Sequence, residues 1–252
     1  MTPQVDLPVL ARTAGWTDVA DELTRSCAAR APEGALLLRP GVVGVLAGAA
    51  PIVWVHGAVD TADLVRTLAA APEVVEVHVR VNDLATTCAL EAAGWRTESV
   101  TAQLVHPMRG TGSRVVPEGY VVSPLDVADL PEVRTVIRDA AGASQALVDA
   151  CYGADFFVRA APAWLFGARD ANGRLVATVG CRRQERSAMV FGLAVDPAHR
   201  SSGLGRVLVE TAVAAGQLAG AAFSHASAEA DALPLALACG FHRVGAWRRL
   251  AR

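Results

Sequence analysis

The sequence predicts an α/β protein built on a mixed α+β sheet, and three observations support this fold class. A continuous apolar run at 190–195 has the length of a buried strand. From residue 204 onward the apolar positions recur at helical spacing. After residue 118 the predicted elements follow the order β-α-α-β-β-β-α-β-α-β.

The elements of the second half follow from local patterns. Asp129, followed by Glu132, is an N-capping signal for a helix that runs to about residue 141. Asp170 to Gly173 has the composition of a hairpin turn. The elements are expected in this order: a strand at 119–124, that helix, a helix at 144–160, strands at 163–169, 174–182 and 188–195, a helix at 203–219, a strand at 221–227, a helix at 231–239 and a strand at 241–250.

The first half is a weaker version of the same pattern. Both halves end with a helix of small residues, then a glycine and an aromatic residue, Gly94-Trp95 and Gly240-Phe241. The segment 111–117 predicts a linker between a domain at 1–110 and a domain at 118–252. In the first half we expect strands at 35–39, 42–46 and 52–55, a helix at 61–70, a strand at 74–81, a helix at 84–93 and a strand at 95–105.

Composition excludes several classes of protein. The net charge is −2 with both signs mixed along the chain, which indicates no nucleic-acid or membrane partner. The five cysteines are scattered, so we expect no metal site and a reducing, cytoplasmic location. No signal peptide is visible, and the apolar runs are too short to span a membrane. The lysine-free composition suggests a bacterial source, and the pair Arg182-Arg183 is expected at a solvated strand end.

The segment 200–205, Arg-Ser-Ser-Gly-Leu-Gly, carries the clearest chemical signal. Gly203 and Gly205 allow a tight turn and let the backbone approach a ligand closely. The N–H groups at the start of the following helix have no internal partner and lie at the positive end of the helix dipole. This segment is therefore predicted to bind a phosphate or pyrophosphate.

The string Arg200-x-x-Gly-x-Gly, placed after a strand that ends in Val-Asp-Pro-x-x-Arg, resembles the acyl-CoA loop of the GCN5-related N-acetyltransferase (GNAT) family. The resemblance covers 118–252 and implies two acetyltransferase-like lobes with acetyl-CoA as cosubstrate. It implies that backbone groups of Leu193, Ala194 and Val195 contact the pantetheine arm and the acetyl carbonyl, at a splay between the strands at 188–195 and 221–227. It also implies that the pyrophosphate is held by Ser201, Ser202, Gly203, Leu204, Gly205 and Arg206, with charge added by the side chain of Arg200 or Arg206.

The first lobe lacks this loop. At the corresponding place it has residues 56–63, His-Gly-Ala-Val-Asp-Thr-Ala-Asp. Asp60 and Asp63 would repel a phosphate at the helix start. The first lobe is therefore expected to be degenerate, and one chain is expected to bind a single CoA.

The catalytic acid is where the chain departs from the family pattern. The family often has an Asn, and a Tyr seven residues later, ahead of the Gly-Phe pair; here these positions are Glu229 and Ala236. Glu229 and His225 lie near the end of the strand at 221–227 and are candidate bases. Tyr152 lies on the second predicted helix, which lines the acceptor site in the family, and is a third catalytic candidate.

These observations predict an N-acetyltransferase that moves an acetyl group from acetyl-CoA directly to a primary amine of a small molecule, such as a metabolite, an amino sugar or an antibiotic intermediate. It would act as a monomer or homodimer. One alternative is a non-catalytic protein that binds or senses acyl-CoA. Another is a transferase of a longer acyl group, for which small residues such as Ala194 would leave room.

Overall fold

The structure is a computed structural model that describes residues 35–46, 51–108, 115–142, 145–153, 156–157 and 162–252. It divides into two compact units. Unit 1 takes its described residues from the first 103 positions, from Ala228–Asp231 and from Arg243–Arg252, and unit 2 comprises Leu104–Ser227 and Ala232–His242. Residues 1–34 of the predicted first domain and 111–114 of the predicted linker lie outside the described residues.

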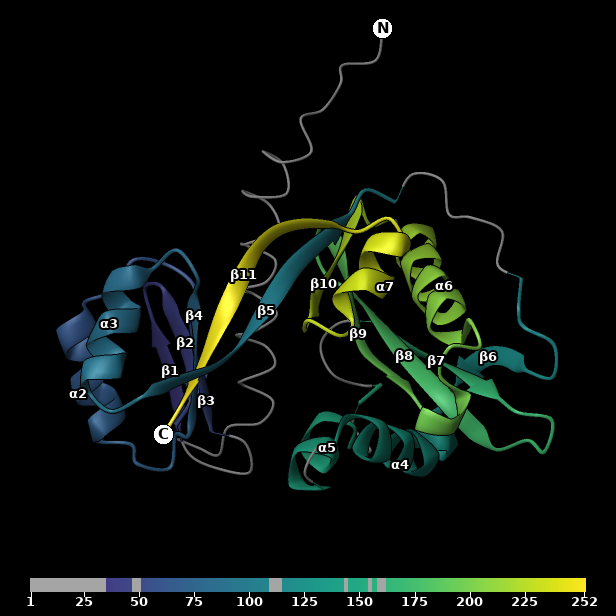
Figure 1. The fold of residues 1–252 in the computed structure, drawn as a ribbon, viewed down its shortest axis with the longest axis horizontal. Coiled ribbons are helices and arrows are strands. Elements are labelled where there is room, and N and C mark those ends of the chain that lie inside the picture. The colour runs from purple at the N-terminus through teal and green to yellow at the C-terminus, as the bar shows by residue number, and fades with distance from the viewer. Residues whose placement is uncertain (1–34, 47–50, 109–114, 143–144, 154–155, 158–161) are drawn as a thin grey trace, which may run out of the picture. The chain divides into compact units, whose positions relative to one another are not determined.

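Unit 1 is a sheet with the strand order β1-β2-β3-β4-β11-β5, accompanied by two helices, α2 and α3, in the described part of the unit (Figure 1). Strands β1, β2 and β3 pair antiparallel, whereas β3 pairs parallel with β4. The bounds are β1 Leu36–Arg39, β2 Val42–Val45, β3 Ile52–Val55, α2 Thr61–Ala69, β4 Glu76–Arg80, α3 Leu84–Ala92, β5 Arg96–His106 and β11 His242–Ala251.

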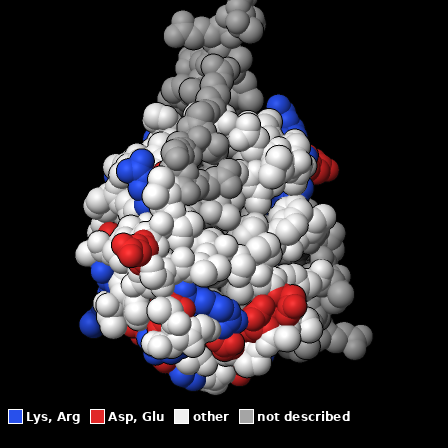
Figure 2. Space-filling view, turned by 90° about the vertical axis from the view of Figure 1, so that its right-hand side faces the viewer, with Lys and Arg blue, Asp and Glu red and all other residues white. Residues whose placement is uncertain are grey.

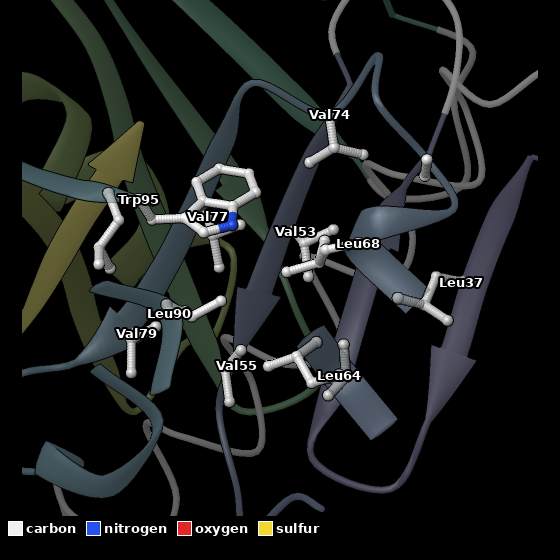
Figure 3. Packing of buried hydrophobic residues seen from close by; sticks show 13 residues of the cluster. Leu37, Val53, Val55, Leu64, Leu68, Val74, Val77, Val79, Leu90 and Trp95 are labelled. Carbon is white, nitrogen blue, oxygen red and sulfur yellow. The ribbon is translucent and has the colours of Figure 1, made fainter. Parts of the chain in front are cut away.

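The core of unit 1 follows from two periodicities. Every second residue of β3 and β4 is a buried valine, so these valines lie on one face of the sheet (Figure 3). Leu64 and Leu68, four positions apart, lie on the face of α2 that packs against them. Trp95, which is 2 % exposed, belongs to the same cluster. The predicted first lobe therefore has a hydrophobic core of its own.

Strand β11 belongs to unit 1, although it lies at the far end of the sequence. It runs antiparallel to β4, with Leu250 opposite Val77. Leu250 is 0 % exposed and is part of the core cluster that contains Leu68 and Trp95. The predicted strand at 241–250 is present, but this division of the chain groups it with the first half, whereas the sequence prediction placed it in a domain at 118–252.

Unit 2 has the strand order β10-β9-β8-β7-β6 (Figure 1). Strands β6, β7, β8 and β9 pair antiparallel, and β9 pairs parallel with β10. The bounds are β6 Val121–Leu125, α4 Leu130–Ala141, α5 Gln145–Cys151, β7 Ala163–Arg169, β8 Leu175–Arg183, β9 Ser187–Val195, α6 Leu204–Leu218, β10 Phe223–Ala228 and α7 Leu233–Ala238. The predicted helix at 144–160 is too long: α5 ends at Cys151, and the described residues after it, among them Tyr152 and Phe156, are not helical.

Helices cover both faces of the unit 2 sheet (Figure 1). Helix α6 packs on β7, β8 and β9, and its Gly216 comes so close to the strand that an added Cβ would lie 2.5 Å from that of Ala188. Helix α4 packs on β8 and β9. On that side Val133, Val148 and Leu165 are buried in one cluster that also contains Tyr152 and Phe156. We call this side of the sheet the α4/α5 face.

The predicted cap of α4 is wrong in one respect. Asp129 makes no side-chain capping bond to α4; its carboxylate accepts instead from the N–H of Asp126, one turn earlier. Asp126 in turn accepts from the N–H of Ala128, which makes a capping box on the preceding short 3₁₀ turn. Asp129 and Glu132 also bind the guanidinium of Arg169 on β7. The two carboxylates therefore fasten the start of α4 to the sheet.

The pair Arg182-Arg183 is not a solvated strand end. Arg183 donates to the carbonyl oxygens of Ala219 at 3.2 Å and Ser187 at 3.2 Å, joining the end of α6 to the β8–β9 hairpin. The Arg182 guanidinium lies over the rings of Phe156 and Phe191, 5.4 and 5.7 Å from their centroids. Adjacent strand residues point to opposite faces of the sheet, so Arg183 contacts the end of α6 and Arg182 contacts the aromatic rings on the α4/α5 face.

Candidate active site

Strand β9 carries a β-bulge near its carboxyl end. Thr178 of β8 pairs with Ala194, but Gly180 pairs with Phe191, so Gly192 and Leu193 lie opposite the single residue Val179. Gly192 has a φ of 60°, a left-handed conformation that favours glycine. An isolated glycine inside an apolar strand run is a sequence signal for a bulge, and the sequence prediction did not use it. The bulge turns backbone groups next to Leu193 and Ala194 out of the regular ladder.

Strands β9 and β10 separate beside this bulge. Their parallel ladder joins Phe223 to Ser187 and ends at the pair His225 and Met189. Strand β9 continues to Val195 and β10 to Ala228 without further pairing between them in the described ladder. Backbone groups beyond His225 and Met189 are therefore available to an extended ligand, as they are at the edge of a sheet. The predicted splay is present at this point.

The loop at 200–205 leads from β9 into α6. Gly203 is the N-cap of α6 with a φ of 91°, and Ser201 has a φ of 62°, an uncommon conformation for a residue with a side chain. Within the described part of the chain, no acceptor bonds the backbone N–H groups of residues 201–206, whereas the N–H of Val207 donates to the carbonyl of Gly203. These free donors at the positive end of a fifteen-residue helix form an anion-binding arrangement.

The two arginines of the loop have partners within the chain. Arg200 donates from Nε to the carbonyl of Val195 at 3.3 Å and from Nη2 to that of Ala140 at 3.0 Å. Arg206 forms an ion pair with Glu210 one turn along α6, at 2.8 Å. Arg200 therefore holds the loop in position, and the backbone supplies most of the donors that face outward.

Tyr152 lies beside the bulge. A Cβ added to Gly192 would lie 2.2 Å from the Tyr152 hydroxyl oxygen, so the phenol occupies the space beside Gly192. The ring stacks on Phe156 with centroids 5.4 Å apart, and the residue is 7 % exposed. Burial raises the pKa of this phenol well above its ordinary value, which keeps the hydroxyl protonated. Tyr152 is thus a neutral hydrogen-bond donor near the end of β9.

His225 and Glu229 are placed differently from Tyr152. The Nε2–H of His225 donates to Oε1 of Gln184 at 2.7 Å, and Gln184 lies in the β8–β9 hairpin, at the opposite end of β9 from the bulge. Burial lowers the pKa of His225 to about 4. Glu229 is exposed and follows β10 within the part of the chain grouped with unit 1. Tyr152 is the catalytic candidate whose contact with the bulge is defined, through its hydroxyl at Gly192.

The corresponding helix start in unit 1 is blocked by its own chain. The carboxylate of Asp60 accepts from the N–H groups of Ala62 and Asp63, both at 3.0 Å. Asp63 forms an ion pair with Arg39. The first N–H groups of α2 are therefore occupied by a side-chain carboxylate, whereas the equivalent N–H groups of α6 are free within the described part of the chain.

Charge on the face shown in Figure 2 is mixed. Among its described residues, basic and acidic side chains lie next to one another and leave wide areas without charge. Opposite charges are also paired within the chain, as in the ion pairs of Arg169 with Asp129 and of Arg174 with Asp196. None of the helices described is both long and apolar enough to cross a membrane. Among the described residues there is also no group of three or more His, Cys, Asp or Glu that could hold a metal ion.

Comparison with known proteins supplies a family. A family model described as "Acetyltransferase (GNAT) family" matches residues 134–241. A GCN5-related N-acetyltransferase from Kribbella flavida has a similar structure, with a TM-score of 0.67, 16 % identity and 94 % of each chain covered. No match was found among curated protein sequences.

Two further structures are similar. A tandem GNAT protein from the clavulanic acid biosynthesis pathway, solved without AcCoA, has a TM-score of 0.61 and 17 % identity, with 96 % of this chain and 94 % of that chain covered. A glucosamine N-acetyltransferase region of a fungal multi-domain GH3 β-N-acetylglucosaminidase has a TM-score of 0.57 and 14 % identity, with 70 % of this chain and 25 % of that one covered. At these identities the likeness shows the fold alone.

The α/β fold, the bulged strand and the helix start are features that this chain shares with proteins of the GNAT fold. The chain contains a GNAT-family domain at residues 134–241, and its fold is that of GNAT proteins, the tandem form among them. The resemblance seen in the sequence is confirmed. Members of this family transfer acyl groups, which gives the chain its general chemistry.

Proposed function

We propose that unit 2 transfers an acetyl group from acetyl-CoA to a primary amine of a small molecule. The observation that carries this proposal is the arrangement along one continuous segment. The separation of β9 from β10 begins after Met189, the bulge lies at Gly192, and the free N–H groups lie at 201–206, so all three are on one segment of the chain. A ligand with a diphosphate, an extended amide-containing arm and a thioester would use the helix start, the unpaired strand edge and the bulge, respectively.

The backbone would do most of the binding. The N–H groups of residues 201–206 would bind the pyrophosphate oxygens, since oriented donors at a helix start favour negative charge. The backbone edges of Leu193, Ala194 and Val195 would bond the amides of the pantetheine arm in the manner of an added strand. This would bring the thioester carbonyl to the bulge.

Tyr152 is the side chain that we propose for the chemical step. Attack of the amine nitrogen forms a C–N bond and moves negative charge onto the carbonyl oxygen, and the C–S bond then breaks. The Tyr152 hydroxyl lies against Gly192 and keeps its proton, so it can donate a hydrogen bond where that charge develops. The amine gives up one proton to water or a buffer base, and the departing thiolate takes one up.

Two of the buried cysteines are poor nucleophiles, which is consistent with direct transfer. Burial raises the pKa of the Cys181 thiol to about 12 and that of Cys239 to about 11, so neither is a ready nucleophile. The four cysteines in the described part of the chain are free thiols, which suits a reducing cytoplasm. As for the acceptor, a small amine is consistent with the glucosamine N-acetyltransferase region among the structural neighbours.

The test is calorimetric titration of acetyl-CoA and CoA into the wild-type chain and into Gly203→Glu. That variant places a carboxylate where the pyrophosphate would bind. Gly94→Glu is the matched control, because Gly94 has the same φ of 91° and no atom lies within 4 Å of its added Cβ. We expect one CoA per chain, binding lost in Gly203→Glu and kept in Gly94→Glu.

Turnover is then measured as CoA thiol release with a panel of amines. Release that depends on the amine, together with a mass gain of one acetyl group on it, supports the transferase. Binding without release across the panel would favour the non-catalytic acyl-CoA protein instead. A stoichiometry of two would contradict the degenerate state of unit 1, and no binding by the wild type would overturn the proposal.

A further inference from the structure

Two glycines on the α4/α5 face are covered by aromatic side chains rather than left open. Gly180 of β8 pairs with Phe191 of β9. A Cβ added to Gly180 would lie 2.4 Å from Cζ of the Phe191 ring and 2.5 Å from Cε2, so the ring lies directly on the glycine. The side chain of Phe191 therefore runs across the strand and fills the space above Gly180.

The second glycine, Gly192, is covered in the same way by Tyr152. An added Cβ would lie 2.2 Å from the hydroxyl oxygen and 3.3 Å from Cζ. Tyr152 stacks on Phe156, and the Phe156 ring centroid is 6.0 Å from that of Phe191. Phe191 and Tyr152 thus form, with Phe156 behind them, a continuous wall of rings on the α4/α5 side of the bulge.

The aromatic side chains of this wall are held in place by contacts with Arg182 and with the buried cluster of the α4/α5 face. The Arg182 guanidinium lies over both Phe156 and Phe191, and Tyr152 and Phe156 belong to a buried cluster with Val133 and Leu165. Ala194, a small residue expected to leave room, is 6 % exposed within the same cluster. The opposite side of β9 is covered by α6, where Gly216 contacts Ala188. If the thioester carbonyl lies at the bulge, an acyl chain longer than acetyl would have to displace one of these rings.

We propose that Phe191 and Tyr152 close the acyl end of the site and restrict the thioester to acetyl, with propionyl as the upper limit. This inference rests on the proposed function, because it assumes that the thioester carbonyl lies at the bulge. An added methylene gains from burial only where it enters without strain. Forcing it into a packed aromatic cluster shifts side chains from their preferred positions, so a longer acyl chain is expected to bind more weakly.

The test compares acetyl-, propionyl-, butyryl- and hexanoyl-CoA with the wild type, Phe191→Ala and Phe191→Leu. Phe191 is only partly buried, so its truncation should leave the fold intact. Phe157→Ala is the matched control, since Phe157 belongs to the same aromatic group but lines a separate hollow with Leu125 and Ala163. Dissociation constants are measured by calorimetry, and kcat/KM by thiol release.

In the wild type we expect butyryl-CoA to be at least about tenfold weaker than acetyl-CoA, since pockets discriminate a methylene by roughly that factor. Phe191→Ala should raise the butyryl-to-acetyl ratio about tenfold or more, Phe191→Leu should give an intermediate value, and Phe157→Ala should leave it unchanged. Circular dichroism confirms that each variant is folded.

Several outcomes would overturn the inference. A wild type that takes butyryl- and hexanoyl-CoA as well as acetyl-CoA has no such wall. A Phe191→Ala variant that binds acetyl-CoA with the wild-type preference shows that the limit lies elsewhere. Both results leave the proposed function intact. If the wild type binds none of the thioesters, the proposed function fails and this inference fails with it. Because affinity alone reports chain length, the test also applies to a chain that binds without turnover.

Discussion

Arg200 joins two elements that are distant in sequence, because its Nη2 donates to the carbonyl oxygen of Ala140, in the last turn of α4, at 3.0 Å. Its Nε donates to Val195 at the end of β9. A helix leaves its last carbonyls without partners, and here a cation satisfies one of them. The start of the glycine loop is thereby fixed to both β9 and α4, so its position depends on an arginine that does not need to contact a ligand.

Arg200→Ala should therefore weaken CoA binding by about tenfold, which corresponds to roughly one lost charged hydrogen bond. The cause would be a displaced loop rather than a lost charge, so raising the salt concentration should change the ratio of variant to wild type little. Arg206→Ala is the comparison, since it removes the same charge from a side chain already paired with Glu210. An equal loss of affinity in both variants, abolished by salt, would contradict the positioning role.

Tyr152→Phe should leave CoA affinity within about twofold of wild type while lowering kcat by a factor on the order of 10²–10³, the effect of removing one donor at a developing oxyanion. The ring stack on Phe156 is kept, so stability should change little. Because burial raises the pKa of this phenol, it should not titrate between pH 7 and 10, and no alkaline loss of kcat should be traceable to it. Unchanged kcat would remove Tyr152 from the chemical step.

His225 makes stability depend on pH. Its folded pKa is about 4, below the ordinary 6.5, so the unfolded chain binds the proton more readily between those two values. Its contribution is complete above pH 6.5 and is lost as the pH falls towards 4, by roughly 3 kcal/mol in all. His225→Leu should flatten that part of the unfolding free energy measured by urea titration. A slope identical to wild type would mean that other groups, such as His106, dominate.

Leu250→Ala should destabilise unit 1 by about 2–5 kcal/mol, the usual cost of emptying a buried leucine site. Leu250 is 0 % exposed in the cluster around Leu68. Hydrogen exchange of the β4 amides gives the readout, because β4 pairs with β11. Leu218→Ala is the control, since that leucine is 89 % exposed at the end of α6 and should cost under about 0.5 kcal/mol. Loss of protection confined to unit 2 would contradict this assignment of β11.

Local patterns predicted most elements of the fold. The alternation of buried valines in β3 and β4 and the helical spacing after Leu204 depend on neighbours in sequence, and both are present in the structure. The partner of β11 could not be predicted, because an apolar strand pattern says nothing about which strand it pairs with. Asp129 is the N-cap residue of α4 as predicted, but its side chain bonds the N–H of Asp126 in the capping box of the preceding 3₁₀ turn, a detail that the capping signal does not contain.

For the candidate site, too, the features set by local sequence could be predicted and those set by tertiary contacts could not. The loop at 200–205 could be predicted from the sequence because its backbone conformation requires glycine, and glycine can be recognised in the sequence. The separation of Tyr152 from His225 was not visible, since it depends on tertiary contacts with Gly192 and Gln184. Whether Leu193, Ala194, Val195 and the loop hold acetyl-CoA, and whether Glu229, His225 or Tyr152 takes part in catalysis, stay predictions for the experiments above.

The assignment of β11 to unit 1 also constrains how the protein is made. A ribosome synthesises β1 to β4 first and β11 only after the whole of unit 2. Domains usually fold in the order in which they are synthesised. Until β11 is synthesised, β4 lacks the strand that pairs with it at Val77. An unpaired strand edge of this kind can pair with the wrong strand. The half of the molecule that is translated first is therefore the half that finishes folding last.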